Sequence, residues 1–411
     1  MKNFFLICSI AALLCGTLSL SAQEYILLND LHTQELPTIP SKDHGGKFVR
    51  KVMNGDKMWE HSHKKLVKAN FSSKAFIRMM KTLYNNTKTH MVGIRCAYWS
   101  QTPQGDSLLV SGKIYLPKNR QLKGIILANH YTIATDMEAP SNIFQMDCIF
   151  AMKDYAVIMP DYVGYGISRQ EVHPYLHWRS AAQTGVDLLN CMPALLDHYG
   201  YSYPTDIIIV GYSQGGAVAL GAARLIEEND FPFPWTVRKL YAGAGPYDPA
   251  ATYDYCVEQD SIGIPGAVPM IVMGMSNAYN LDFQLEDFFH EPLLSHYNEW
   301  VASKQYTVGQ IGHMMGSGRM SVLMRAEVLD KHNALAQQLY KALFDNSNIG
   351  YPLQASAYFL HSTDDDVVPL INSENLKAAM PDNTHITYDF DSYGAHVEAA
   401  FPFMKYVYQD L

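Results

Sequence analysis

The stretch DIIIVGYSQGG, residues 206–216, decides the fold, because an apolar run leads directly into a serine ringed by glycines. Residues 206–210 are typical of a buried strand, and the segment that follows the glycines is typical of a helix. Glycines alone would indicate only a tight turn. The order strand, G-x-S-x-G, helix predicts more: a nucleophile elbow, in which strained backbone lifts the hydroxyl of Ser213 above a sheet.

Short apolar strands alternate with helical segments on both sides of this stretch. Strands are expected at residues 124–130, 156–162, 206–212, 239–245, 355–362 and 385–390. Near-continuous apolar strands separated by helices indicate an α/β fold, with a mostly parallel sheet and helices on both faces. Two alternating runs joined by a turn that contains Gly105 predict a hairpin ahead of them.

One interval breaks the alternation, between Gly245 and Ala355. A structureless loop of roughly a hundred residues is implausible in a compact domain. The interval is rich in methionine and aromatic residues and looks helical. We therefore predict an inserted helical cap, residues 249–346, between a first part of the core (90–248) and a second part (347–411).

The N-terminus predicts export. A lysine, an apolar stretch and small residues in 1–22 are typical of a signal peptide, and residues 23–89 of an N-terminal arm. The apolar run is short and no second span follows, so we expect a periplasmic or secreted protein without a stable membrane anchor.

The cysteines leave two alternatives open. Four remain after the signal peptide: Cys96, Cys148, Cys191 and Cys256. An oxidising compartment allows disulfides, in any of three connectivities. Four buried free thiols are the other alternative, since a domain of this size needs no covalent cross-links.

Charge and motifs argue against other partners. The formal charge is −9 and the chain has no long basic run, so no nucleic-acid partner is expected. The chain also lacks a dinucleotide or phosphate-binding motif and a cluster with zinc spacing, and we expect neither cofactor nor metal.

Catalysis by serine needs a base, a carboxylate that orients the base, and donors for the developing oxyanion. After the strand that ends at Ser362, three aspartates compete for the carboxylate: Asp364, Asp365 and Asp366. After the last strand comes His396, the expected base, whereas His385 lies within that strand. The backbone N–H of Gln214 would be one oxyanion donor, and Tyr131 or Thr132 would provide the other.

These segments resemble the α/β-hydrolase superfamily of serine hydrolases, and within it the secretory lipase and esterase group. The similar segments are NHYT (129–132), PDYVGYGIS (160–168), HPYL (173–176), AGAGPYDP (242–249) and HSTDDDVVP (361–369). The resemblance implies the α/β-hydrolase fold, selects Asp365 as the triad carboxylate and favours Thr132 in the oxyanion hole. Ser362 and Tyr131 stand where that group usually has glycine.

The expected function is therefore ester hydrolysis through Ser213, Asp365 and His396, with a small-molecule ester or lipid as substrate. A serine peptidase on the same fold is the alternative, and it would need charged cap residues to hold a peptide terminus. Glu286, Asp287 and Glu291 are candidates for that role. A non-catalytic binding protein on the same scaffold is the third class, since a fold does not guarantee activity.

Overall fold

The computed structural model describes residues 25–27, 91–143, 145–229, 233–380 and 384–411. The predicted signal peptide, residues 1–22, lies outside the described residues. So does the predicted arm, residues 23–89, except for one short strand at Tyr25–Leu27.

The described residues form a nine-stranded sheet in the order β1-β2-β3-β5-β4-β6-β7-β8-β9. Its strands are β1 (Tyr25–Leu27), β2 (Met91–Gln101), β3 (Ser107–Pro117), β4 (Gly124–Asn129), β5 (Tyr155–Pro160), β6 (Asp206–Tyr212), β7 (Thr236–Gly243), β8 (Ser356–Ser362) and β9 (Ile386–Asp391). The pairs β1–β2, β2–β3 and β3–β5 are antiparallel, and every later pair is parallel. The predicted hairpin and the mostly parallel sheet are confirmed.

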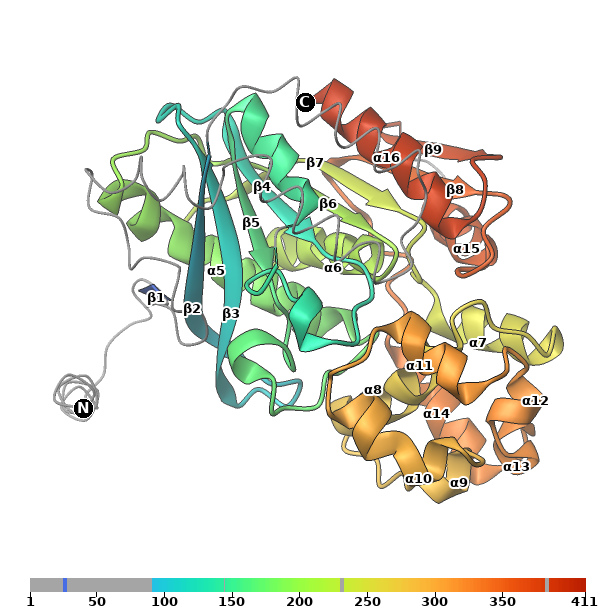
Figure 1. Cartoon of the computed structure of the whole chain (residues 1–411). Coiled ribbons are helices and arrows are strands. Elements are labelled where there is room, and N and C mark those ends of the chain that lie inside the picture. The colour runs from blue at the N-terminus through green and yellow to red at the C-terminus, as the bar shows by residue number, and fades with distance from the viewer. Residues whose placement is uncertain (1–24, 28–90, 144, 230–232, 381–383) are drawn as a thin grey trace, which may run out of the picture.

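Helices cover both faces of the sheet, which explains why its central strands are apolar throughout. In β6, Ile207 and Ile209 pack with helices α5 (Trp178–His198) and α6 (Gln214–Glu228). The alternate residues, Ile208 and Val210, pack on the other face with η2 (Met146–Lys153) and α16 (His396–Asp410). Figure 1 shows α5 and α6 on one side of the strands and α16 on the other.

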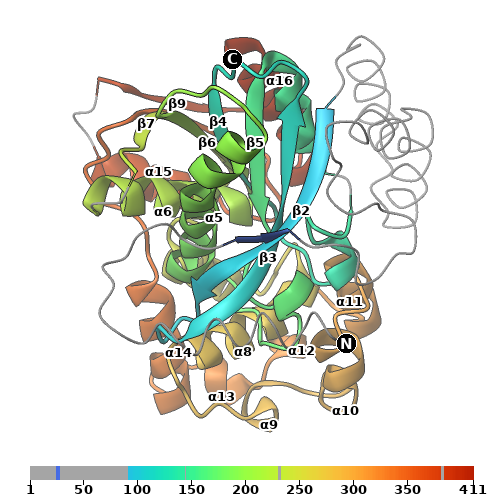
Figure 2. The same cartoon turned by 90° about the vertical axis from the view of Figure 1, so that its left-hand side faces the viewer.

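A group of short helices lies between β7 and β8 in the chain. They are α7 (Pro249–Glu258), η4 (Pro265–Ala267), α8 (Val268–Ala278), α9 (Leu285–Phe288), α10 (Leu293–Tyr297), η5 (Asn298–Ala302), α11 (Val308–Met315), α12 (Met320–Leu323), α13 (Ala326–Leu329) and α14 (Ala334–Asp345). Their buried side chains, such as Met275 and Phe288, form a second hydrophobic cluster, which also includes Ala134 and Tyr175 from outside the group. Figures 1 and 2 show the group gathered at one end of the sheet, and we call residues 249–345 the cap.

Two further features bear on the expectations from sequence. Cys96, Cys148, Cys191 and Cys256 are all buried free thiols, so the alternative without disulfides is the one observed. Within the described residues, no helix combines the length and the apolar character needed to cross a membrane.

Candidate active site

Ser213 sits at the sharp turn between β6 and α6. Its φ of 58° is a backbone conformation that residues with side chains rarely adopt. The turn is too tight for side chains around it: a Cβ on Gly211 would lie 1.9 Å from the Gly215 carbonyl oxygen, and one on Gly215 would lie 2.1 Å from the Asn129 carbonyl oxygen. Glycine is therefore required at these two positions because other backbone segments pass too close for a side chain, as is typical of a nucleophile elbow.

The structure brings Ser213, His396 and Asp365 together in one hydrogen-bonded chain. The Nε2 atom of His396 is 2.8 Å from Ser213 Oγ, and its Nδ1 atom is 2.6 Å from Asp365 Oδ2. The carboxylate can only accept, so the imidazole proton lies on Nδ1 and Nε2 accepts from the serine hydroxyl. This is the arrangement in which a serine can transfer its proton as it attacks.

The carboxyl group of Asp365 is held as an anion. Burial alone would raise its pKa, but hydrogen bonds from His361 and His396 outweigh that effect and hold the pKa below its ordinary value. Its other oxygen, Oδ1, accepts from the backbone N–H groups of Val367 and Val368, at 2.9 and 2.8 Å. The side chain is fully buried. The position is therefore set up to orient the His396 imidazole.

The two neighbouring aspartates do not contact the imidazole ring of His396. Asp364 is exposed, and its carboxylate accepts from the hydroxyl of Ser392. Asp366 is also exposed, and its Oδ1 accepts from the backbone N–H of His396 at 3.1 Å. Of the three aspartates that competed in the sequence, only Asp365 reaches the ring.

Ser362, which stands where similar proteins usually have glycine, joins the turns that carry Asp365 and His396. Its hydroxyl donates to the Gly394 carbonyl at 2.6 Å and accepts from the Tyr393 N–H at 3.1 Å. It also accepts from the Asp364 N–H at 3.2 Å. The substitution therefore adds a cross-link between the two loops, which no pattern in the sequence had indicated.

The two segments predicted to form the oxyanion hole lie against each other. Gln214 is the first residue of α6, and Thr132 follows the end of β4. The backbone of Gly215, in α6, lies directly against the carbonyl group of Asn129, at the end of β4. Both Thr132 and Gln214 are buried, and the Thr132 hydroxyl is 2.7 Å from the phenol oxygen of Tyr175. Whether their N–H groups bind an oxyanion stays a prediction.

Residues 161–175, which we call the supporting loop, hold the segment that contains Thr132. The ring of Tyr162 stacks on His130 with centroids 3.9 Å apart. Tyr165 donates its hydroxyl to the Ile133 carbonyl at 2.5 Å. Burial lowers the pKa of His130 to about 4, so its ring is neutral; its Nδ1 lies 2.7 Å from the Tyr131 carbonyl oxygen and its Nε2 lies 3.3 Å from the Asp161 carbonyl oxygen.

The supporting loop also fixes the side chain of Gln214. His173 donates from Nδ1 to the Val163 carbonyl at 2.7 Å, so its Nε2 accepts from the Gln214 amide at 3.2 Å. Burial lowers the pKa of His173 to about 3, which keeps this tautomer neutral. One loop thus contacts both predicted halves of the oxyanion hole. Sequence reasoning missed this role, although the HPYL segment had marked His173.

The cap contains an apolar cavity. Aliphatic, methionine and cysteine side chains dominate its wall, among them Leu176, Cys256, Ile271, Met320, Met324 and Leu339. A smaller pocket beside the elbow is lined by Leu176, His177 and Gln214. Leu176 lines both the cavity and this smaller pocket, so the two hollows share one wall residue.

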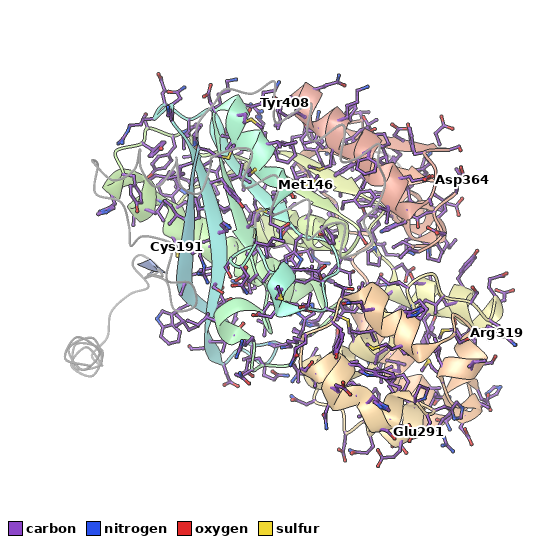
Figure 3. The ribbon with its side chains drawn as sticks, viewed as in Figure 1. Met146, Cys191, Glu291, Arg319, Asp364 and Tyr408 are labelled. Atoms are coloured by element: carbon purple, nitrogen blue, oxygen red, sulfur yellow. The ribbon has the colours of Figure 1, made fainter. Side chains whose placement is uncertain are left out.

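The acidic cap residues that a peptidase could use to hold a peptide terminus lie away from the cavity and from the pocket beside Gln214. Glu286 and Glu291 are exposed, and Glu291 accepts hydrogen bonds from Ser295. Figure 3 shows Glu291 at the far end of the cap from the sheet. Neither Glu286, Asp287 nor Glu291 lines the apolar cavity or the pocket beside Gln214.

Comparisons with known proteins agree with this architecture. Residues 146–394 match the model of the Alpha/beta hydrolase family. The rice cell wall degrading esterase LipA from Xanthomonas oryzae is similar in structure, with a TM-score of 0.68 and 19% identity over 79% of this chain and 89% of that one. Lipase A from Candida antarctica is similar with a TM-score of 0.58 and 13% identity, over 76% of this chain and 74% of that one. At such identities the likeness concerns the fold alone. No curated protein sequence matches the chain significantly.

Proposed function

The chain belongs to the alpha/beta hydrolase family, and from that premise we propose that it is a serine hydrolase that cleaves carboxylic esters. The observation that carries the proposal is the hydrogen-bonded chain from Ser213 through His396 to Asp365 at the elbow. The proposed residues are those expected from the sequence, with the N–H groups of Gln214 and Thr132 as oxyanion donors.

The proposed reaction proceeds through an acyl-enzyme. Ser213 Oγ attacks the ester carbonyl carbon while its proton passes to His396 Nε2, and the carbonyl oxygen becomes an oxyanion stabilised by the two N–H groups. The carbon–oxygen bond to the alcohol then breaks, and the imidazolium returns the proton to the leaving alkoxide. Water attacks the acyl-enzyme with the same proton transfers, which releases the acid and restores Ser213. Asp365 stays ionised and stabilises the imidazolium throughout.

The substrate we propose has an apolar acyl group that occupies the cap cavity. The cavity wall is almost wholly apolar, and methionines such as Met320 and Met324 adapt to chains of different shape. Each buried methylene would contribute about 0.8 kcal/mol. A charged peptide terminus would lose its solvation there without a partner, because the acidic cap residues do not line the cavity. Their placement supports an ester over a peptide substrate.

We also propose export to the periplasm or the medium, on the strength of the signal-like residues 1–22 alone. Mass spectrometry of the mature N-terminus from a secreting host would test it. A protein that keeps Met1 and stays in the cytoplasm would contradict export.

A substrate panel tests the proposed activity. Hydrolysis of p-nitrophenyl esters should become more efficient with acyl length until the cavity is full, and aminoacyl amides with a free amino group should be poor substrates. Leu339→Trp, which would narrow the cavity that Leu339 lines, should lower kcat/KM for long esters more than for the acetate, whose single methyl group has little apolar surface to bury there. Efficient peptide cleavage that depends on Glu286, Asp287 or Glu291 would establish the peptidase instead.

A further inference from the structure

Lys304 of the cap, which follows η5, reaches into the hydrolase core. Its Nζ donates to three backbone carbonyls of the supporting loop: those of Gly164 at 2.5 Å, of Arg169 at 2.8 Å, and of Glu171. An ammonium group has three donors and here each has one acceptor. The ammonium also lies 5.5 Å from the centre of the Tyr165 ring.

The backbone of Lys304 holds the other loop. Its carbonyl accepts from the N–H of Asp136 at 2.9 Å, four residues after Thr132. Asp136 in turn accepts from the Gly166 N–H of the supporting loop at 2.7 Å. Lys304 has a φ of 53°, so its backbone is held in a conformation that it would not adopt freely. One cap residue therefore joins both loops beside the elbow.

The loop that Lys304 binds is the one that positions the predicted oxyanion donors. Between its Gly164 and Glu171 contacts lies Tyr165, which donates to the Ile133 carbonyl. Two residues after Glu171 comes His173, which accepts from the Gln214 amide. A change in the loop at the Lys304 contacts would therefore move groups on both sides of Ser213.

We propose that Lys304 is a positioning residue for catalysis: from the cap, it holds the supporting loop in the shape that aims the N–H groups of Thr132 and Gln214 at the oxyanion. The proposal rests on the proposed function, since it needs an oxyanion to form at Ser213. If Lys304 acts in this way, the oxyanion hole forms correctly only when the cap is folded against the core. This role of the cap is separate from any role in binding the acyl group.

The ammonium group of Lys304 can lose its proton at mildly alkaline pH. Burial lowers the pKa of its ammonium to about 8, opposed by the nearby carboxylates of Asp136 and Glu171 and assisted by Arg169. Two further titratable groups face the ammonium: His173, which is already neutral at this pH, and Tyr165, whose phenol stays protonated because burial raises its pKa. As the pH rises through about 8, the amine loses one of its three donors and the loop loses one of its three contacts.

Lys304→Met tests the proposal, because it keeps the stem and removes every donor. Lys331→Met is the matched control, since Lys331 is also a cap lysine but is exposed and pairs with Asp254 at the surface. With p-nitrophenyl acetate, which is too short to fill the cap cavity, Lys304→Met should lower kcat by about 10- to 100-fold at nearly constant KM. Removal of an oxyanion donor outright costs about 100- to 1,000-fold. Lys331→Met should change neither constant.

Hydrogen exchange measures the positioning without relying on activity. Backbone amides of residues 129–136 should exchange faster in Lys304→Met than in the wild type or Lys331→Met. Unchanged exchange there, or a rise in KM with kcat preserved, would overturn the proposal. A wild type that neither hydrolyses esters nor reacts with a fluorophosphonate would instead overturn the proposed function.

A third measurement is the pH dependence of kcat. The kcat of the wild type should fall as the pH rises through about 8, and Lys304→Arg, which stays charged, should not show that fall. A wild-type profile that stays flat to pH 10 would contradict the proposal.

Discussion

Replacing Asp365 by asparagine should cost far more activity than its small change in shape suggests. The Oδ1 atom accepts from two backbone N–H groups, so asparagine would keep its oxygen there and turn its NH₂ group toward His396 Nδ1. Two N–H donors cannot face each other, and the imidazole proton would move to Nε2. That nitrogen could then no longer accept from Ser213. A comparable loss of the correct tautomer costs about ten-thousandfold in kcat, or about 5.4 kcal/mol at 1.36 kcal/mol for each factor of ten.

The assay is steady-state hydrolysis of an aryl ester by Asp365→Asn beside the matched controls Asp364→Asn and Asp366→Asn. The Asp364 carboxylate accepts from Ser392 at the surface, so its change should cost less than about threefold. The variant Asp366→Asn would retain an oxygen that can accept from the His396 N–H, so its effect should also be small. Equal losses at the three positions, or the largest loss at Asp364, would refute the assignment.

Three further predictions follow from single contacts. Gly215→Ala should destabilise the protein by at least about 2 kcal/mol in urea unfolding, since its Cβ would lie 2.1 Å from the Asn129 carbonyl oxygen; equal stability would contradict the close approach. Cys96, Cys148, Cys191 and Cys256 should be unreactive toward a thiol reagent in the native state and all reactive after unfolding without a reductant, and protection of any of them after unfolding would indicate a disulfide. The pKa of Asp365 is lower in the folded than in the unfolded protein, so its contribution to stability is present above about pH 4 and lost as the pH falls below that value. On acidification, Asp365→Asn should therefore lose less stability than the wild type, and equal losses would contradict this prediction.

The positions of the central strands along the chain and the place of the elbow could be predicted because each depends on local sequence. An apolar run followed by G-x-S-x-G specifies a strand, a turn and a helix within eleven residues, and His396 was marked by its place after the last strand. The choice among Asp364, Asp365 and Asp366 came only from resemblance. In the structure it depends on which carboxylate turns inward to meet the Val367 and Val368 N–H groups.

The contacts that shape the rest of the site join residues distant in the chain, and no local pattern indicates them. Lys304 lies about 130 residues beyond the loop whose carbonyls it binds, within a cap whose composition predicted only helices and an apolar core. Ser362 looked like a departure from a motif, and its bond to Gly394 appears only once β8 and β9 are paired. No pattern in the sequence distinguished free from paired cysteines, and the four free thiols appear only in the folded structure.

The central claim is that Ser213 is the nucleophile, activated by His396. Its most direct test is to treat the protein with a fluorophosphonate and identify the modified residue by peptide mass spectrometry, with Ser213→Ala as the control. We expect one phosphonyl group per chain, on Ser213, and none on a folded Ser213→Ala protein. Modification of another serine, or labelling that persists in Ser213→Ala, would contradict the claim.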